Sequence, residues 1–251
     1  MSELHYSNFR AVAFDFDGTL CDTNHLHDTA REEAFRRIAV ETGDSRYTNI
    51  PSEIHAEAHH HGSNPLTIIG WVLQQAGLVG EDAAHDPATL TVVKLKSELY
   101  AQSMMTGGEA IGDAVPLIRK LSSRSPGKQA IVTTARRTHE VMPFLNRYKI
   151  NRYFPDNRLV TCEDVPAERM KPDSLAYEIM LDRFGLTNTP EKMLVIEDSA
   201  YGIEAAKKVG ATVVAVATTR TEEALNRLQG YQHPDAVAID FMHLSGMLGI
   251  R

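Results

Sequence analysis

The chain has 251 residues, 43% of them hydrophobic and 24% charged, which is enough for one large globular domain or two modest ones. The net charge is −7, and runs of Lys and Arg are at most two residues long. Both observations argue against a protein that binds nucleic acid through an extended positively charged surface. The N-terminal sequence has no signal-peptide pattern, and no apolar stretch approaches the roughly 20 residues of a membrane helix. We therefore expect a cytoplasmic protein without a membrane partner, whose cysteines, Cys21 and Cys162, are reduced thiols.

The first predicted element is a buried strand at 11–17, and a long helical segment follows it. The run AVAFDFD is typical of a strand that is covered on both faces. From residue 24 to residue 105 no stretch is convincing as a strand, and the patterns at 27–43, 64–78 and 88–105 have helical apolar spacing. We interpret 24–105 as an α-helical cap domain inserted after the first strand.

Strands and helices alternate over the remainder of the chain. Apolar runs predict strands at 129–134, 193–198, 211–217 and, more weakly, 235–240. Helical patterns lie around them at 110–123, 139–149, 172–185 and 199–210, the last two ending on Gly185 and Gly210. This order predicts an α/β fold with a doubly wound parallel sheet, a Rossmann-like core formed by 1–23 and 106–251.

Reactive side chains follow three of the predicted strands, where an open α/β sheet binds its ligands. They come in pairs: Asp15 and Asp17, Thr133 and Thr134, Glu197 and Asp198. Residues i and i+2 of an extended chain point to the same side, so Asp15 and Asp17 can face one site. Carboxylates gathered in this way repel one another, and a divalent cation with hard oxygen ligands, Mg²⁺, relieves the repulsion best.

The pattern also predicts a reaction. A carboxylate such as Asp15 can attack phosphorus, provided that cations neutralise the phosphoryl oxygens. Asp17 can then donate a proton to the leaving oxygen and later take one from water. Thr133 and Lys171 can hold the phosphoryl group. Taken alone, Thr133 is better explained as a threonine that caps the next helix, and Lys171 as a surface lysine before a helix start.

Four motifs, in order, resemble those of the haloacid dehalogenase superfamily. They are DFDGT at 15–19, IVTT at 131–134, KPD at 171–173 and VIEDSAYGIEAAKKVG at 195–210. The resemblance implies an aspartate nucleophile, phosphate holders and an Mg²⁺ site. By this resemblance, Asp15 is the nucleophile, and Asp17 is the acid/base and a metal ligand through its backbone carbonyl. Thr133 and Lys171 bind the phosphate. Asp198 binds Mg²⁺, and Glu197 beside it either orients Lys171 or coordinates the metal through water.

Within the superfamily, the sequence looks most like β-phosphoglucomutase and related sugar-phosphate and phosphoglycolate phosphatases. In that branch His27 matches a histidine near the hinge and the active site, which implies a contact with substrate. The mutase also has an arginine just after a glycine in a cap loop, but no arginine follows Gly62 here. His55 and His59 have a metal-ligand spacing, yet the plainer interpretation is a solvated cap face, and His60 or His61 can touch the leaving group.

We expect an Mg²⁺-dependent phosphoric monoester hydrolase acting on a small phosphorylated metabolite through a phosphoaspartate. Two alternatives stay open: a phosphosugar mutase, and a regulator that binds a metabolite without catalysis. The sequence names neither the substrate nor the oligomeric state.

Overall fold

The computed structural model describes residues 4–58, 64–106 and 108–250. The chain divides into two compact units, Met1–Thr23 with Gly107–Arg251, and Asn24–Thr106. The first unit is discontinuous, because the second is inserted between its strands β2 (Cys21–Asp22) and β3 (Glu109–Ala110), which pair antiparallel with each other. Neither of these short strands was predicted, since two residues are too few to show a pattern.

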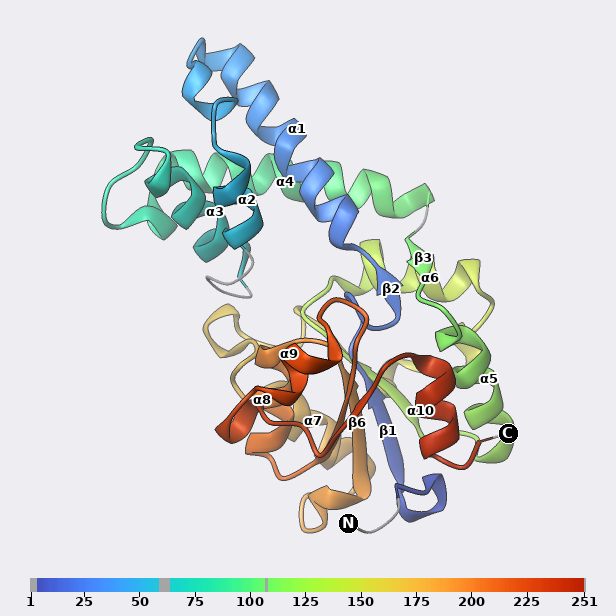
Figure 1. The fold of residues 1–251 in the computed structure, drawn as a ribbon. Coiled ribbons are helices and arrows are strands. Elements are labelled where there is room, and N and C mark those ends of the chain that lie inside the picture. The colour runs from blue at the N-terminus through green and yellow to red at the C-terminus, as the bar shows by residue number, and fades with distance from the viewer. Residues whose placement is uncertain (1–3, 59–63, 107, 251) are drawn as a thin grey trace. The chain divides into compact units, whose positions relative to one another are not determined.

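The larger unit is built around a six-stranded parallel sheet in the order β5-β4-β1-β6-β7-β8 (Figure 1). Its central strand pairs on both sides, with Ala13 opposite Ala130 in one neighbour and Val195 in the other. The predicted α/β doubly wound fold is therefore confirmed. The bounds are β1 Ala11–Phe14, β4 Gln129–Val132, β5 Leu159–Val160, β6 Met193–Glu197, β7 Thr212–Val216 and β8 Ala236–Ala238.

Helices cover both faces of this sheet (Figure 1). Alternate strand residues such as Ala13 and Val195 pack against Met180 and Ile203, while Val12 and Phe14 point to the opposite face. Burial on both faces explains why these strands are continuous apolar runs. The helices are α5 Ala114–Arg124, α6 Met142–Arg147, α7 Leu175–Phe184, α8 Ala200–Lys208, α9 Glu222–Asn226 and α10 Phe241–Met247.

One helix start and one edge strand differ from the predictions for local reasons. The helix expected from Pro172 begins at Leu175, with Ser174 as its N-cap. In the turn before it, the Leu175 amide donates to Asp173 Oδ1 at 2.8 Å. The edge strand β5 went unpredicted because it has only two residues. Gly185 ends α7 as expected, with a φ of 64° that suits glycine.

The second unit contains only helical elements among its described residues, 24–58 and 64–106. They are α1 Asn24–Thr42, α2 Ser52–Glu57, α3 Pro65–Gln75 and α4 Pro87–Thr106, with short 3₁₀ turns between them. Buried side chains from α1, α3 and α4 make its core, including Phe35, Leu73 and Val92. Among the helices described, none is long and apolar enough to cross a lipid bilayer.

Candidate functional site

Asp15 stands at the carboxyl end of the central strand β1 and is 7% exposed. Its amide donates to the Ile196 carbonyl at 2.9 Å, which fixes the backbone where the strand ends. Its Oδ1 accepts from Lys171 Nζ at 2.6 Å. Burial, followed by the charge of Glu197, raises the pKa of this carboxyl well above its usual range, despite the opposing effect of Lys171.

Lys171 is buried, at 5% exposure, so the plain surface-lysine interpretation is wrong. Its ammonium donates to three acceptors: Asp15 Oδ1 and Glu197 Oε1, both at 2.6 Å, and the Val132 carbonyl at 2.9 Å. Burial by itself lowers the pKa of Lys171, but the two carboxylates outweigh it and hold the pKa well above the ordinary lysine value. The group is therefore a fixed positive charge in the middle of the site.

Glu197 is fully buried, and both of its oxygens are already engaged. Oε1 accepts from Lys171 and from the Tyr177 hydroxyl, the latter at 3.3 Å. Oε2 accepts from the amides of Asp198 and Ser199 and from the Ser199 hydroxyl, at 3.1–3.2 Å. Gly202 lies directly behind the carboxylate, where an added Cβ would stand 1.7 Å from Oε1. The arrangement favours orientation of Lys171 over metal ligation.

Asp198 accepts one hydroxyl on each carboxylate oxygen. Thr19 donates to Oδ1 at 2.8 Å, and Thr219 donates to Oδ2 at 2.5 Å. The sequence did not indicate Thr219, although it follows strand β7 just as the predicted site residues follow theirs. Burial and the neighbouring Glu197 raise the pKa of Asp198 to about 7.

Gly18 allows the turn after β1 to lie close to Asp198 and to the turn after β7. Its φ of +74° is unfavourable for other residues, and a Cβ there would lie 2.6 Å from Asp198 Oδ2. Its carbonyl accepts from the Thr218 hydroxyl at 2.5 Å. The turn after β1 is therefore held against the turn after β7.

The remaining predicted residues are placed as follows. Asp17 is half-buried in the turn between β1 and β2, close enough for its charge to raise the pKa of Asp15. Thr133 is buried, and its Oγ1 accepts the Ala135 amide at 3.0 Å within the turn after β4. The helical turn that follows has Arg136 at its N-cap and no side-chain cap bond, so Thr133 does not cap it. Thr134 is half-buried beside it.

His27 lies on α1, in the other compact unit. Its ring stacks on Tyr100 with centroids 3.9 Å apart, and its Nδ1 is 2.7 Å from Lys96 Nζ. His55 is half-buried, with its ring centroid 5.8 Å from that of Phe35. The prediction that it lies on a solvated face is therefore wrong. Burial lowers the pKa of His55. The predictions on His59, His60, His61 and Gly62 fall outside the described residues.

The two cysteines offer no alternative nucleophile. Both are free thiols, as predicted, with Cys21 buried and Cys162 half-buried. Burial raises the pKa of Cys162 to about 11 and that of Cys21 further, so neither forms a thiolate near neutral pH.

Asp15, Glu197 and Asp198 form an acidic cluster that fits a hard divalent cation. One oxygen of each lies within 4.8 Å of the others, and all three residues are buried. Carboxylate oxygens suit Mg²⁺ better than soft metals. Because Glu197 is saturated with donors, the carboxylates of Asp15 and Asp198 are the better ligands.

We expect the affinity of this cluster for a divalent cation to rise with pH. A cation competes with the proton on Asp198, whose pKa of about 7 in the metal-free protein makes that proton significant at neutral pH. The dissociation constant for Mn²⁺, used as a probe, should fall about fivefold from pH 6 to pH 7, about twofold more by pH 8, and then level off. Calorimetric titration across this range is the measurement, and an affinity unchanged between pH 5.5 and 8 would contradict the assignment of Asp198.

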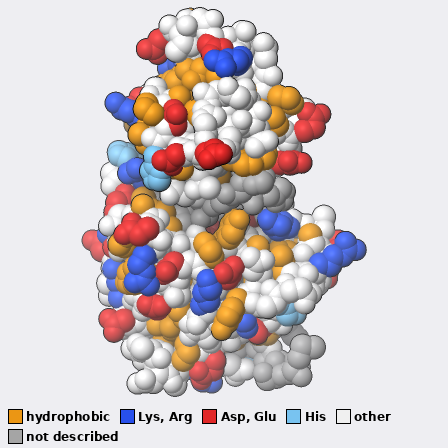
Figure 2. Space-filling model, turned by 90° about the vertical axis from the view of Figure 1, so that its left-hand side faces the viewer, with side chains coloured by type: hydrophobic (Ala, Val, Ile, Leu, Met, Phe, Trp, Pro, Cys, Tyr) orange, Lys and Arg blue, Asp and Glu red, His pale blue; other side chains and the backbone are white. Residues whose placement is uncertain are grey.

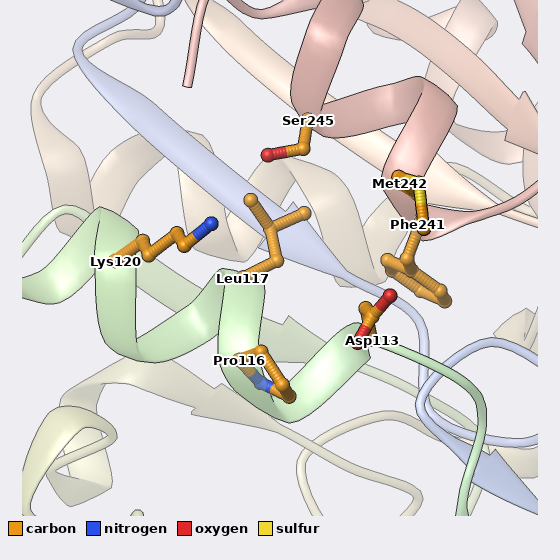
Figure 3. Close-up of a pocket in the computed structure, with 7 residues that line it drawn as sticks. All are labelled: Asp113, Pro116, Leu117, Lys120, Phe241, Met242 and Ser245. Carbon is orange, nitrogen blue, oxygen red and sulfur yellow. The ribbon is translucent and has the colours of Figure 1, made fainter. Parts of the chain in front are cut away.

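One surface groove of the larger unit is lined by none of the predicted site residues. This groove of about 210 Å³ between α5 and α10 is lined by Leu117, Phe241 and Met242 with Asp113 and Lys120 at its sides (Figure 3). On the face shown in Figure 2, lysine and arginine side chains are interspersed with aspartate and glutamate.

Comparisons with known proteins point to one family. The model of the haloacid dehalogenase-like hydrolase family matches residues 9–210. A phosphoglycolate phosphatase from Aliivibrio fischeri is 24% identical over 255 residues, covering 98% of this chain and 99% of that protein. A phosphorylated carbohydrates phosphatase from Thermotoga maritima is 25% identical over 236 residues, covering 87% and 98%. The crystal structure of an Entamoeba histolytica HAD hydrolase, family IA, variant 3, shares the fold, with a TM-score of 0.73, 21% identity and coverage of 96% and 99%.

Proposed function

The chain belongs to the haloacid dehalogenase-like hydrolases, and we propose that it is an Mg²⁺-dependent phosphatase acting on a small phosphorylated metabolite of the sugar-phosphate or phosphoglycolate type. The observation that carries this proposal is the buried contact of 2.6 Å between Lys171 and Asp15, beside Asp198 at the carboxyl end of the sheet. An aspartate held by a fixed ammonium in this way is suited to attack a phosphoryl group.

The reaction follows from the roles of two aspartates. Asp15 attacks phosphorus, the bond between phosphorus and the leaving oxygen breaks, and Asp17 gives its proton to that oxygen. Water then attacks the phosphorus of the phosphoaspartate and passes a proton to Asp17, which releases phosphate and restores Asp15. Asp17 begins the next turnover protonated.

The other residues bind and neutralise charge. Asp198 and Asp15 would hold Mg²⁺ together with the Asp17 carbonyl, and Glu197 would orient Lys171. When bound, the metal offsets the negative charge of the phosphoryl oxygens. Thr133 and Thr134 would donate to those oxygens from the end of β4.

We further propose that residues 24–105 act as the cap that selects the leaving group, with His27 in substrate binding. The Lys96–His27 contact gives this unit a cationic group, which suits an anionic or hydroxylated leaving group. Two free cysteines support a reducing compartment such as the cytoplasm.

Phosphate release tests the proposal directly. The purified protein is incubated with a panel of sugar phosphates, phosphoglycolate and nucleotides, with Mg²⁺ or with EDTA. We expect turnover on one class of small phosphate ester that EDTA abolishes. No release from any substrate by folded, Mn²⁺-binding protein would overturn hydrolysis, and activity that appears only with a sugar bisphosphate would indicate a mutase.

A further inference from the structure

Tyr177 makes two contacts with the charged centre of the site. It is the third residue of α7 and is fully buried. Its hydroxyl donates to Glu197 Oε1 at 3.3 Å, and the Lys171 ammonium stands 5.3 Å from the centre of its ring. One side chain thus touches both members of the Lys171–Glu197 ion pair.

The contacts of Glu197 show what the hydroxyl adds. The three donors to Oε2 come from residues 198 and 199, immediately after Glu197 in the chain. Oε1 receives Lys171 and Tyr177 alone among the described donors, and Tyr177 comes from a helix outside that loop. The phenol therefore connects the carboxylate to α7 and limits its rotation.

The ring acts on Lys171 from another direction. A lysine has four rotatable bonds, and its ammonium here must reach Asp15, Glu197 and the Val132 carbonyl together. An aromatic face within about 6 Å attracts a cation and resists its departure. Burial raises the pKa of Tyr177 well above its usual value, so the hydroxyl stays a donor throughout the physiological range.

We propose that Tyr177 is a positioning residue, which holds Glu197 by its hydroxyl and Lys171 by its ring and thereby fixes the ammonium against Asp15. The consequence for turnover rests on the proposed phosphatase function, whereas the placement of Lys171 does not. Ordinary helical spacing makes Tyr177 look like one more core aromatic, because Ala176, Met180 and Leu181 of the same helix are buried core residues.

The test compares Tyr177→Phe with Tyr6→Phe. Tyr6 is a matched control, a buried phenol of the same unit whose hydroxyl donates to the Leu121 carbonyl at 3.5 Å. A buried ammonium with three acceptors exchanges its protons slowly, so its proton–nitrogen signal can be observed by NMR and assigned by its loss in Lys171→Met. We expect Tyr177→Phe to shift this signal and to speed its exchange about threefold or more, and Tyr6→Phe to leave it unchanged.

Kinetics supply the second readout. Loss of one hydrogen bond to the ion pair should lower kcat about three- to tenfold with KM within twofold of the parent value. The proposal would be overturned if the Lys171 signal did not move in Tyr177→Phe, or if it moved equally in Tyr6→Phe. A rise in KM with kcat unchanged would also overturn it. If the parent protein releases no phosphate, the phosphatase assignment fails, and the NMR comparison still decides the role of Tyr177.

Discussion

Asp15→Asn should abolish phosphate release while leaving the metal-free protein no less stable. The amide keeps the size of the side chain but cannot attack phosphorus, so we expect kcat to fall at least about a thousandfold. Stability is expected to hold because the variant removes one of three buried carboxylates that repel one another. Phosphate release and urea denaturation at pH 7 in EDTA are the two measurements.

The pH dependence of that stability gives a sharper test. Because the pKa of Asp15 is raised in the folded state, folded protein binds more protons than unfolded protein above the ordinary aspartate pKa of about 4. Parent stability in EDTA therefore falls as pH rises from there, and Asp15→Asn should lose less over the same range. Asp113→Asn, which changes an exposed carboxylate without a side-chain capping bond, is the control. A variant less stable than the parent at pH 7 would contradict the repulsive cluster.

Lys171→Met should have the largest effect on stability of any single change at the site. Methionine fills a similar volume, but Asp15 and Glu197 lose the ammonium that both contact at 2.6 Å. Removing one partner of a buried ion pair costs about 3–5 kcal/mol, because the charge left behind stays buried. We expect a loss of that order in the free energy of unfolding at pH 7, and no detectable phosphate release.

The matched control is Lys207→Met. Lys207 contacts Asp235 at 2.8 Å, but this pair is partly exposed to solvent, and a surface pair is worth about 0–1 kcal/mol. The deficit of Lys171→Met should shrink as pH falls toward 4, because Asp15, whose pKa burial already raises, takes up a proton. Urea denaturation of both variants at pH 7 and pH 5 tests this, and similar losses for the two lysines would show that Lys171 is not the central counter-ion.

Much of the fold could be predicted from the chain because strands buried on both faces are strongly apolar. The central strands β1, β4, β6 and β7 follow this rule, whereas β5 is too short to show it. Helix starts were harder to place, since Pro172 suits a first turn, yet α7 begins at Leu175 after its N-cap Ser174.

The residues of the candidate site also include some that the sequence could predict and some that it could not. Asp15, Glu197 and Asp198 could be expected to meet, because they end neighbouring parallel strands. Lys171 is on no strand, and its local sequence alone predicts a surface residue. Only the need for a cation near the acidic cluster indicated a place for it in the site. Thr219 and Tyr177 could not be selected, since a hydroxyl after a strand and an aromatic in a helix are ordinary features whose partners only the fold supplies.

The central position of β1 has a consequence for how the protein is made. Val12 is translated before both of its sheet partners, Gln129 and Leu194. The inserted helices are contiguous in the chain and can pack during synthesis, whereas β1 must wait until most of the chain has been translated. Until β4 and β6 have been translated, β1 is an unpaired apolar strand, and this is the period when a chaperone would protect it best.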